Sequence, residues 1–208
     1  RTIRITGTGS ALPGRIVTNK ELEQMVETSD EWIRERTGIA ERHVSVGETV
    51  VTLASEAARK ALEQAGKRAE EIDLILVATC SPEQYLPCCA CQVQADIGAV
   101  NALAFDVNAA CSGFLFALNT ADAYLRMGLA ENALIIGSEV LSKLVDWTDR
   151  GSCILFGDGA GAVVVERCKA ESRAVEEKQI PAAGILGRAL HSDGTGGGVL
   201  QCDARELT

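Results

Sequence analysis

The sequence predicts an α/β fold built around a substantial layered sheet, and three observations lead to this prediction. Short β-rich apolar runs alternate along the chain with segments whose apolar residues recur at helical spacing. The 208 residues include 20 glycines but only 4% aromatic side chains, a composition that allows helices to pack closely on a sheet. The hydrophobic fraction of 47% and the charged fraction of 24% are ordinary for a globular protein.

The first third of the chain is predicted to form one strand and three helices. Asn19 is a good N-cap for the first helix, and Ser29 or Asp30 for the second, because their side chains can accept hydrogen bonds from the first helical turn. The third helix keeps apolar residues at helical spacing up to Gly66, a residue type that favours helix ends. The elements are Ile3–Gly7, Asn19 to about Val26, a short helix that carries Trp32 and Arg36, and Val50–Ala65.

The remainder of the chain is predicted to supply four more strands and two more helices. Leu74–Ala78 is apolar throughout, as expected of a strand buried on both faces. Gly98 and Gly128 are expected to end the two helices. The elements are Leu74–Ala78, about Cys88 to Ile97, Leu103–Val107, residues 113–127, Ala133–Gly137 and Gly161–Glu166.

Charge and cysteine content exclude several classes of protein. The formal net charge of −9 argues against broad non-specific nucleic-acid binding, which needs clustered Lys and Arg. No apolar run approaches the roughly 20 residues of a membrane span, so a soluble protein is expected. The eight cysteines come without a signal peptide and several lie in apolar runs, which favours reduced thiols in a cytoplasmic protein.

The most informative segment surrounds Cys111. It reads Asn-Ala-Ala-Cys-Ser-Gly-Phe from Asn108 to Phe114 and stands between a predicted buried strand and an apolar helix. The start of a helix directs unpaired N–H groups and a positive dipole end at such a thiol, which favours a nucleophilic thiolate and can stabilise an oxyanion. For this segment alone, a structural cysteine at a helix start is the alternative.

Four segments, in order and at matching spacing, resemble the signature motifs of the β-ketoacyl–acyl carrier protein synthase III family, which are condensing enzymes of the thiolase fold. The resemblance extends from Gly7 to Gly194, so it covers nearly the whole chain. It implies that Cys111 is the acyl-accepting nucleophile. The segments are Thr28–His43, Asp106–Phe114, Thr148–Ala162 and Leu190–Gly194.

The resemblance also implies roles in binding coenzyme A. Trp32 and Arg150 would enclose the adenine, and Arg36 would help to bind the phosphates, in keeping with the stacking of aromatic and guanidinium planes on bases and the affinity of Arg for phosphate. The alternatives are a half-buried helix anchor for Trp32 and a solvated charge for Arg36.

A second implied feature is the segment Tyr85-Leu86-Pro87-Cys88. In the family, the matching loop reaches across a dimer and shapes the acyl pocket of the partner, which would assign Leu86 and Pro87 to that pocket. Leu86 stands where the family commonly has Phe, and the smaller side chain could admit a longer or branched acyl primer.

The family fold has two similar halves in a five-layer α/β/α/β/α sandwich, and the resemblance implies that this chain supplies the N-terminal half. Residues 1–168 are expected to form that half-domain, and residues 169–208 to lead toward a C-terminal half. The chain starts at Arg1 without Met and stops at Thr208 in a polar segment, so it is expected to be part of a longer protein. The catalytic His and Asn belong to motifs resembling His-Gln-Ala-Asn and Gly-Asn-Thr-Ser, which this sequence lacks.

The implied reaction is a decarboxylative Claisen condensation of an acyl-CoA primer, expected to be acetyl-CoA, with malonyl–acyl carrier protein. It would start fatty-acid chains in a cytoplasmic homodimer that uses coenzyme A thioesters as substrates and has no cofactor. The partners would be acyl-CoA and acyl carrier protein, with neither nucleic acid nor membrane. The alternatives are a secondary-metabolite acyltransferase or ketosynthase of the same fold and a non-catalytic acyl-CoA-binding half-protein.

Two further patterns are expected to be structural. Cys88-Cys89-x-Cys91 has no second ligand pair at zinc spacing, and a helix would direct Cys88 and Cys91 to one face and Cys89 away, so no metal site is expected. The glycine-rich runs Gly157–Gly161 and Gly194–Gly198 lack the features of phosphate loops. His43 and His191 have no partner at a suggestive spacing.

Overall fold

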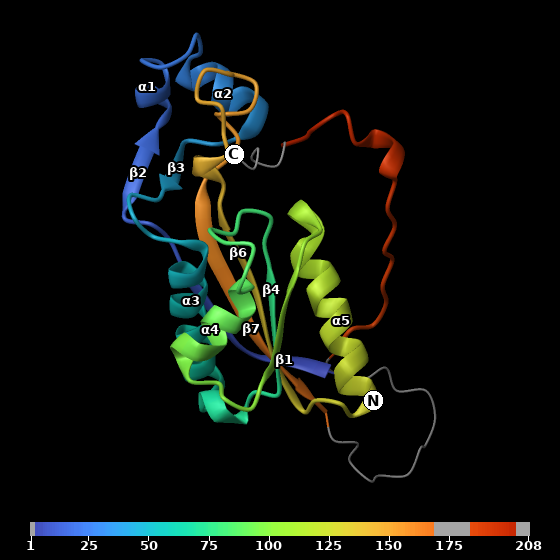
Figure 1. Ribbon diagram of the computed structural model, residues 1–208. Coiled ribbons are helices and arrows are strands. Elements are labelled where there is room, and N and C mark those ends of the chain that lie inside the picture. The colour runs from blue at the N-terminus through green and yellow to red at the C-terminus, as the bar shows by residue number, and fades with distance from the viewer. Residues whose placement is uncertain (1–2, 169–183, 203–208) are drawn as a thin grey trace.

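A five-stranded mixed sheet forms the centre of the protein (Figure 1). The computed structural model describes residues 3–168 and 184–202. The strands follow the spatial order β1-β7-β6-β4-β5, with β4 parallel to both β5 and β6, and β7 antiparallel to both β1 and β6. Their bounds are β1 Ile3–Ala11, β4 Leu74–Ala78, β5 Leu103–Val107, β6 Asn132–Val140 and β7 Asp158–Arg167.

Helices cover both faces of this sheet (Figure 1). The helices α3 and α4 pack on one face and α5 packs on the other, so each face has its own apolar cluster. All three helices end at a glycine in the left-handed conformation, as the sequence predicts. Their bounds are α3 Val50–Ala65, α4 Cys89–Ile97 and α5 Gly113–Met127.

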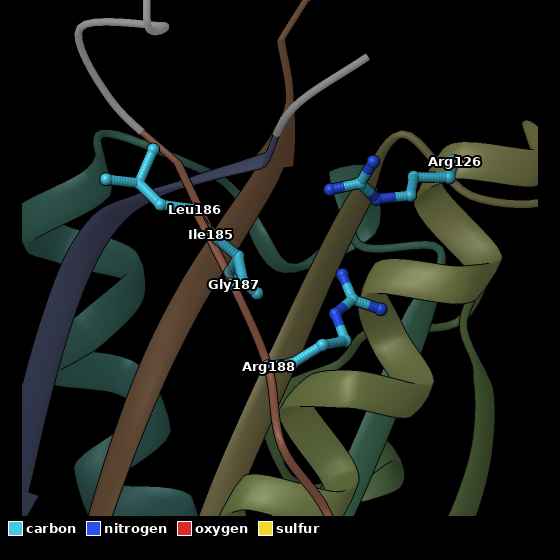
Figure 2. Close-up of a pocket in the computed structure, with 5 residues that line it drawn as sticks. All are labelled: Arg126, Ile185, Leu186, Gly187 and Arg188. Carbon is cyan, nitrogen blue, oxygen red and sulfur yellow. The ribbon is translucent and has the colours of Figure 1, made fainter.

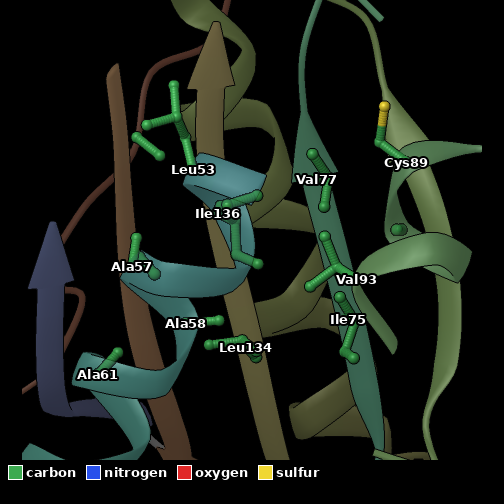
Figure 3. Close-up of a cluster of buried hydrophobic side chains, with 14 of the residues drawn as sticks. Leu53, Ala57, Ala58, Ala61, Ile75, Val77, Cys89, Val93, Leu134 and Ile136 are labelled. Carbon is green, nitrogen blue, oxygen red and sulfur yellow. The ribbon is translucent and has the colours of Figure 1, made fainter. Parts of the chain in front are cut away.

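The core between α3 and the sheet is made of small side chains from the helix and branched side chains from the strands (Figure 3). Every residue of β4 is buried, as predicted for a central strand with both faces covered. Full burial of each Val, Leu or Ile contributes roughly 1.5–3 kcal/mol relative to exposure. The cluster includes Leu53, Ala57, Ala58 and Ala61 of α3 and Ile75, Val77, Leu134 and Ile136 of the strands.

A smaller unit of short elements lies at one end of the sheet (Figure 1). Its two strands pair antiparallel, and its apolar side chains form a separate buried cluster. The buried Arg42 joins this unit to the approach to β7, because its guanidinium donates to the carbonyl oxygens of Val17 and Ile154, both at 3.1 Å. The elements are β2 Arg15–Thr18, α1 Asn19–Leu22, α2 Asp30–Thr37 and β3 Glu41–Val44.

The prediction that Asn19 caps the first helix is wrong by one residue. Thr18 is the N-cap, in a capping box with Glu21, whose carboxylate accepts the Thr18 backbone N–H at 2.8 Å. The Asn19 side chain is buried and donates instead to Asp30 and to the Ile39 carbonyl, both at 2.8 Å. The helix is also shorter than predicted and continues only as turns, whereas Ser29 caps α2 as predicted.

The C-terminal segment, residues 184–202, runs alongside α5 (Figure 1). Ile185 packs against the α5 cluster, and Arg188 forms an ion pair with the fully buried Asp122 of that helix. The predicted polar loop Lys169–Gln179 lies outside the described residues. The expected division of the chain after residue 168 stays a prediction.

Candidate active site

Three parallel strands end at the same edge of the sheet and bring a set of reactive groups together there. The strands β5, β4 and β6 are neighbours in that order. Cys80 follows β4, Cys111 follows β5, and Glu139 is the second-last residue of β6. In open α/β sheets, ligands bind in the crevice beyond the carboxyl ends of the strands. The short elements with α2 lie at this same end of the molecule (Figure 1).

Cys111 occupies a tight turn between β5 and α5. The residues Ala110–Ser112 form a 3₁₀ turn, and α5 begins directly afterwards at Gly113. A side chain on Gly113 would approach the Ala78 Cβ to 3.1 Å, so the start of α5 lies closely against β4. The cysteine is exposed, and the N-terminal end of the 15-residue α5 places partial positive charge beside it.

Ala110 has a positive backbone φ of 44°, the only such value for a non-glycine residue in the part of the chain that the structure describes. This conformation costs an L-residue roughly 1–2 kcal/mol and is concentrated at functional sites. The strain immediately precedes Cys111 in the turn. The arrangement has the form of a nucleophile elbow, in which a strained strand-to-helix turn exposes the reactive side chain.

Glu139 and Cys80 are parts of this edge that sequence reasoning missed. The Glu139 carboxylate accepts hydrogen bonds from the Cys80 backbone N–H at 2.8 Å, from Thr79 Oγ1 at 3.2 Å and from Ser81 Oγ. Burial raises the pKa of Cys80 to about 12, with further contributions from Glu139 and from the nearby Cys111. Cys80 is therefore a neutral thiol close to Cys111. The available signal was that each residue stands two positions beyond a predicted apolar strand, Leu74–Ala78 for Cys80 and Ala133–Gly137 for Glu139.

Asp106 connects the strand before Cys111 to the start of α4. Its two carboxylate oxygens accept the backbone N–H groups of Cys89 at 2.8 Å and Ala90 at 2.7 Å. These N–H groups belong to the first turn of α4, which has no helical carbonyl to bind, and the negative charge also suits a helix N-terminus. Asp106 thus fixes β5 and α4 relative to each other just ahead of the reactive turn.

Substitution of Asp106 by Ala should destabilise the protein by about 2–3 kcal/mol, because two charge-assisted hydrogen bonds to a half-buried helix start are lost. Urea unfolding followed by circular dichroism measures this change. Glu56→Ala is the control on α3, where the carboxylate forms an exposed ion pair with Lys60 at 2.7 Å and loss should cost at most about 1 kcal/mol. Equal losses in the two variants would contradict the anchoring role of Asp106.

The structure brings together the three residues predicted to bind coenzyme A. Trp32 lies in the first turn of α2, after the Ser29 side chain caps the helix through the Trp32 N–H at 3.1 Å. The guanidinium of Arg36 is 4.9 Å from the centroid of the indole ring, and that of Arg150 is 5.3 Å from it. Both distances are typical of cation–π contacts. Arg150 is also held by a 3.0 Å hydrogen bond to the Glu27 carbonyl.

The loop ahead of α4 presents apolar side chains to solvent in this chain. Leu86 is 85% exposed and Tyr85 is 73% exposed. Pro87 is attached to α4 through its carbonyl, which accepts a 3.0 Å hydrogen bond from Gln92 Nε2. The assignment of Leu86 and Pro87 to an acyl pocket stays a prediction.

Other candidate sites lie apart from Cys111. A hollow of about 400 Å³ is lined by Arg126 and residues 185–188 (Figure 2). It lies near the C-terminal end of α5, whereas Cys111 precedes the N-terminal end of this helix, and the two ends are about 20 Å apart. Among residues 3–168 and 184–202, no group of three His, Cys, Asp or Glu could hold a metal ion. His43 Nδ1 lies 2.7 Å from the Pro13 carbonyl oxygen, a contact in keeping with a structural role.

Comparison with known protein families places this site in context. Residues 105–194, which include Cys111, match the family described as 3-Oxoacyl-[acyl-carrier-protein (ACP)] synthase III. The chain is 51% identical over 205 residues to the beta-ketoacyl-[acyl-carrier-protein] synthase III of Clostridium acetobutylicum, with 99% of this chain and 59% of the relative covered. The chain therefore spans about three fifths of the length of this relative.

Solved structures agree with the sequence relationship. The 3-oxoacyl-(acyl carrier protein) synthase III of Pseudomonas aeruginosa superposes with a TM-score of 0.89 at 37% identity, covering 100% of this chain and 62% of that structure. The priming β-ketosynthase of the R1128 polyketide pathway gives a TM-score of 0.79 at 38% identity, covering 81% of this chain and 51% of that structure. The predicted thiolase-like α/β fold is confirmed. Within the described residues, no helix is long and apolar enough to cross a membrane.

Proposed function

The chain belongs to the β-ketoacyl–acyl carrier protein synthase III family, and from this premise we propose that Cys111 is the acyl-accepting nucleophile of a condensing enzyme. The observation that carries the proposal is the strained turn at Ala110, which exposes Cys111 at the start of α5 and beyond the ends of three parallel strands. A buried structural cysteine has no need of such a turn. The neighbouring thiol of Cys80 is less suited, because its raised pKa keeps it neutral.

The proposed reaction begins with acyl transfer. The Cys111 thiolate attacks the thioester carbonyl of acyl-CoA, with acetyl-CoA as the expected primer, and the coenzyme A thiolate leaves to give an acyl-cysteine. N–H groups at the start of α5 are the candidates to stabilise the oxyanion of the tetrahedral intermediate. Malonyl–acyl carrier protein then loses carbon dioxide, and the resulting carbanion attacks the acyl carbonyl. A 3-ketoacyl–acyl carrier protein forms, and the Cys111 thiolate is released.

The second half-reaction needs donors that stabilise an enolate. The family motifs that supply His and Asn for this purpose have no counterpart among the 208 residues, so we expect these groups to come from a C-terminal half of the complete protein. These 208 residues without them would accept an acyl group slowly, and condensation would be negligible.

Trp32, Arg36 and Arg150 form the proposed coenzyme A site. The two guanidinium groups flank the indole within 5.3 Å, so an aromatic surface suited to a base lies beside two positive charges suited to phosphates. Coenzyme A carries both chemical groups. The helix α2, which carries Trp32 and Arg36, lies at the same end of the sheet as the start of α5, which directly follows the Cys111 turn, and this supports the proposal (Figure 1).

Substitution of Trp32 by Ala is expected to weaken coenzyme A binding by about 10- to 100-fold, the effect of losing a stacking surface and its cation–π partners. Isothermal titration calorimetry measures the dissociation constant. Alkylation of Cys111 by iodoacetamide, which does not need the trio, should keep its wild-type rate and serves as the internal control. Unchanged coenzyme A affinity would place the adenine elsewhere.

We also propose that the protein forms a homodimer. The strand β5 is at the edge of the sheet and exposes 54% of Leu103, which suits pairing with a second copy. The exposed Leu86 and the adjoining Pro87 would then reach the acyl pocket of the partner. The seven cysteines from Cys80 to Cys168 form no disulfide, in keeping with the proposed cytoplasmic location.

A reconstituted reaction of the full-length protein tests the function. Acetyl-CoA and malonyl–acyl carrier protein should yield acetoacetyl–acyl carrier protein, detected by intact-mass spectrometry of the carrier. An acyl-enzyme that forms but transfers its acyl group only to a small-molecule acceptor would favour the secondary-metabolite acyltransferase. Binding of acyl-CoA with neither an adduct nor a product would favour the non-catalytic alternative.

A further inference from the structure

A pair of cysteines at the start of α4 has no part in the proposed reaction. Cys88 is the N-cap of the helix and Cys91 lies in its first turn, three residues further on. The Cys88 carbonyl accepts the Gln92 backbone N–H at 3.2 Å, so the two cysteines share a single helical turn. The helix therefore directs both thiols to the same side, in the Cys-x-x-Cys spacing that many redox-active dithiols use.

Cys88 and Cys91 are more accessible to solvent than Cys89, which lies between them in the sequence. Cys91 is exposed and Cys88 is partly buried. Cys91 Sγ lies 3.7 Å from the Ala104 carbonyl oxygen, and a hydrogen bond with the Cys88 thiol raises the pKa of Cys91, with desolvation adding to it. Cys89 is fully buried in the core beneath α3. Only Cys88 and Cys91 are thus available to each other and to a small reagent.

The geometry allows a bond between these two sulfurs. Side chains three residues apart on a helix have Cβ atoms about 5–6 Å apart, and a disulfide needs about 3.5–4.5 Å. Cys88 has the extended backbone of an N-cap, with φ −65° and ψ 154°, so a small rotation there can close the gap without disturbing the helix.

We propose that Cys88 and Cys91 form a reversible intramolecular disulfide by exchange with a small-molecule disulfide such as oxidised glutathione. One cysteine thiolate attacks the glutathione disulfide, forming a mixed disulfide and releasing one glutathione thiolate. The second cysteine, deprotonated to solvent, attacks the protein sulfur of that bond and releases the second glutathione. The protein loses two hydrogen atoms, and one oxidised glutathione becomes two reduced molecules.

The proposed bond would act on the loop ahead of α4. Cys88 directly follows Pro87, whose carbonyl is attached to Gln92 of the helix. A bridge to Cys91 would add a covalent tie between the exposed loop and the first turn of α4, the same turn that Asp106 holds. The loop with Leu86 would then be fixed more firmly under oxidising conditions than under reducing conditions.

Redox titration of the full-length protein in glutathione buffers tests the proposal. The sample is quenched with acid and alkylated with iodoacetamide, then reduced and labelled with N-ethylmaleimide. Trypsin would leave five cysteines in one peptide from Ala69 to Arg126, so chymotrypsin, which cleaves after Tyr85, is used to separate Cys80 from the pair. The expected result is a mass loss of two hydrogen atoms, with the second label on Cys88 and Cys91 only.

Three variants make the result specific. Cys88→Ser keeps a preferred N-cap residue and so should fold, yet it should abolish the two-hydrogen loss, as should Cys91→Ser. The exposed Cys202→Ser should oxidise like the wild type. The proposal is overturned if the wild type shows no such loss at any glutathione ratio, stops at a glutathione adduct, or loses the two hydrogens equally in both single variants.

Discussion

Replacement of Gly9 by Ala should prevent stable folding, because α3 lies directly on the backbone of β1 at this position. A Cβ added to Gly9 would lie 2.1 Å from the Ala57 carbonyl oxygen and 2.6 Å from the Ala61 backbone nitrogen. Both are backbone atoms of the 16-residue α3, so the whole helix would have to move away from the sheet. The expected cost exceeds about 4 kcal/mol, a large share of the 5–15 kcal/mol by which domains are stable.

Gly161 supplies the matched control for this prediction. It lies on β7 opposite Ser10, next to the pair formed by Gly9 and Ala162, and a Cβ there would meet nothing within 4 Å. Gly161→Ala should therefore change the stability by at most about 1 kcal/mol. Soluble yield and the urea midpoint of each variant are the measurements. A Gly9→Ala protein as stable as Gly161→Ala would show that α3 does not pack on β1 as described.

Elements whose apolar pattern is local could be predicted closely from the sequence. The helix Val50–Ala65 and the strand Leu74–Ala78 were predicted to the residue, because their buried positions show directly in the sequence, as a helical period in the first and a continuous apolar run in the second. The edge strand Leu103–Val107 was also predicted to the residue, although none of its side chains is fully buried. The strand β1 was predicted too short, since its second half contains Thr8, Gly9 and Ser10 and so carries no apolar pattern, although it pairs with β7 along its whole length. Strands β2 and β3 were missed because four-residue strands carry too few apolar positions to reveal a period.

The residues of the candidate site also fall into those that local motifs predict and those whose roles depend on the order of the strands. The motifs pointed to Cys111, and the structure places the guanidinium groups of Arg36 and Arg150 against the Trp32 ring. The roles of Glu139 and Asp106 depend on which strand ends are neighbours. The spatial order β5-β4-β6 differs from the order of these strands along the chain. No local sequence pattern could therefore reveal that Glu139 accepts hydrogen bonds from the residues just after β4.

Substitution of Cys111 by Ala should abolish acyl-enzyme formation and reduce condensation by at least about 10⁴-fold, as loss of the nucleophile does in other enzymes with covalent intermediates. No other thiol should take over: Cys80 is kept neutral by burial and by Glu139, and Cys89 is buried in the core. Intact-mass spectrometry after incubation of the full-length protein with acetyl-CoA measures the adduct directly, and product formation from malonyl–acyl carrier protein measures the rate.

Cys91→Ala separates this effect from general thiol chemistry, because Cys91 is exposed like Cys111 but lies on α4 rather than in the strained turn. That variant should keep one acetyl group per chain. Since coenzyme A would bind through Trp32 and the two arginines, the Cys111→Ala protein should also bind coenzyme A with wild-type affinity. An adduct that survives in Cys111→Ala and disappears in Cys91→Ala would move the nucleophile to α4, and the strain at Ala110 would then need another explanation.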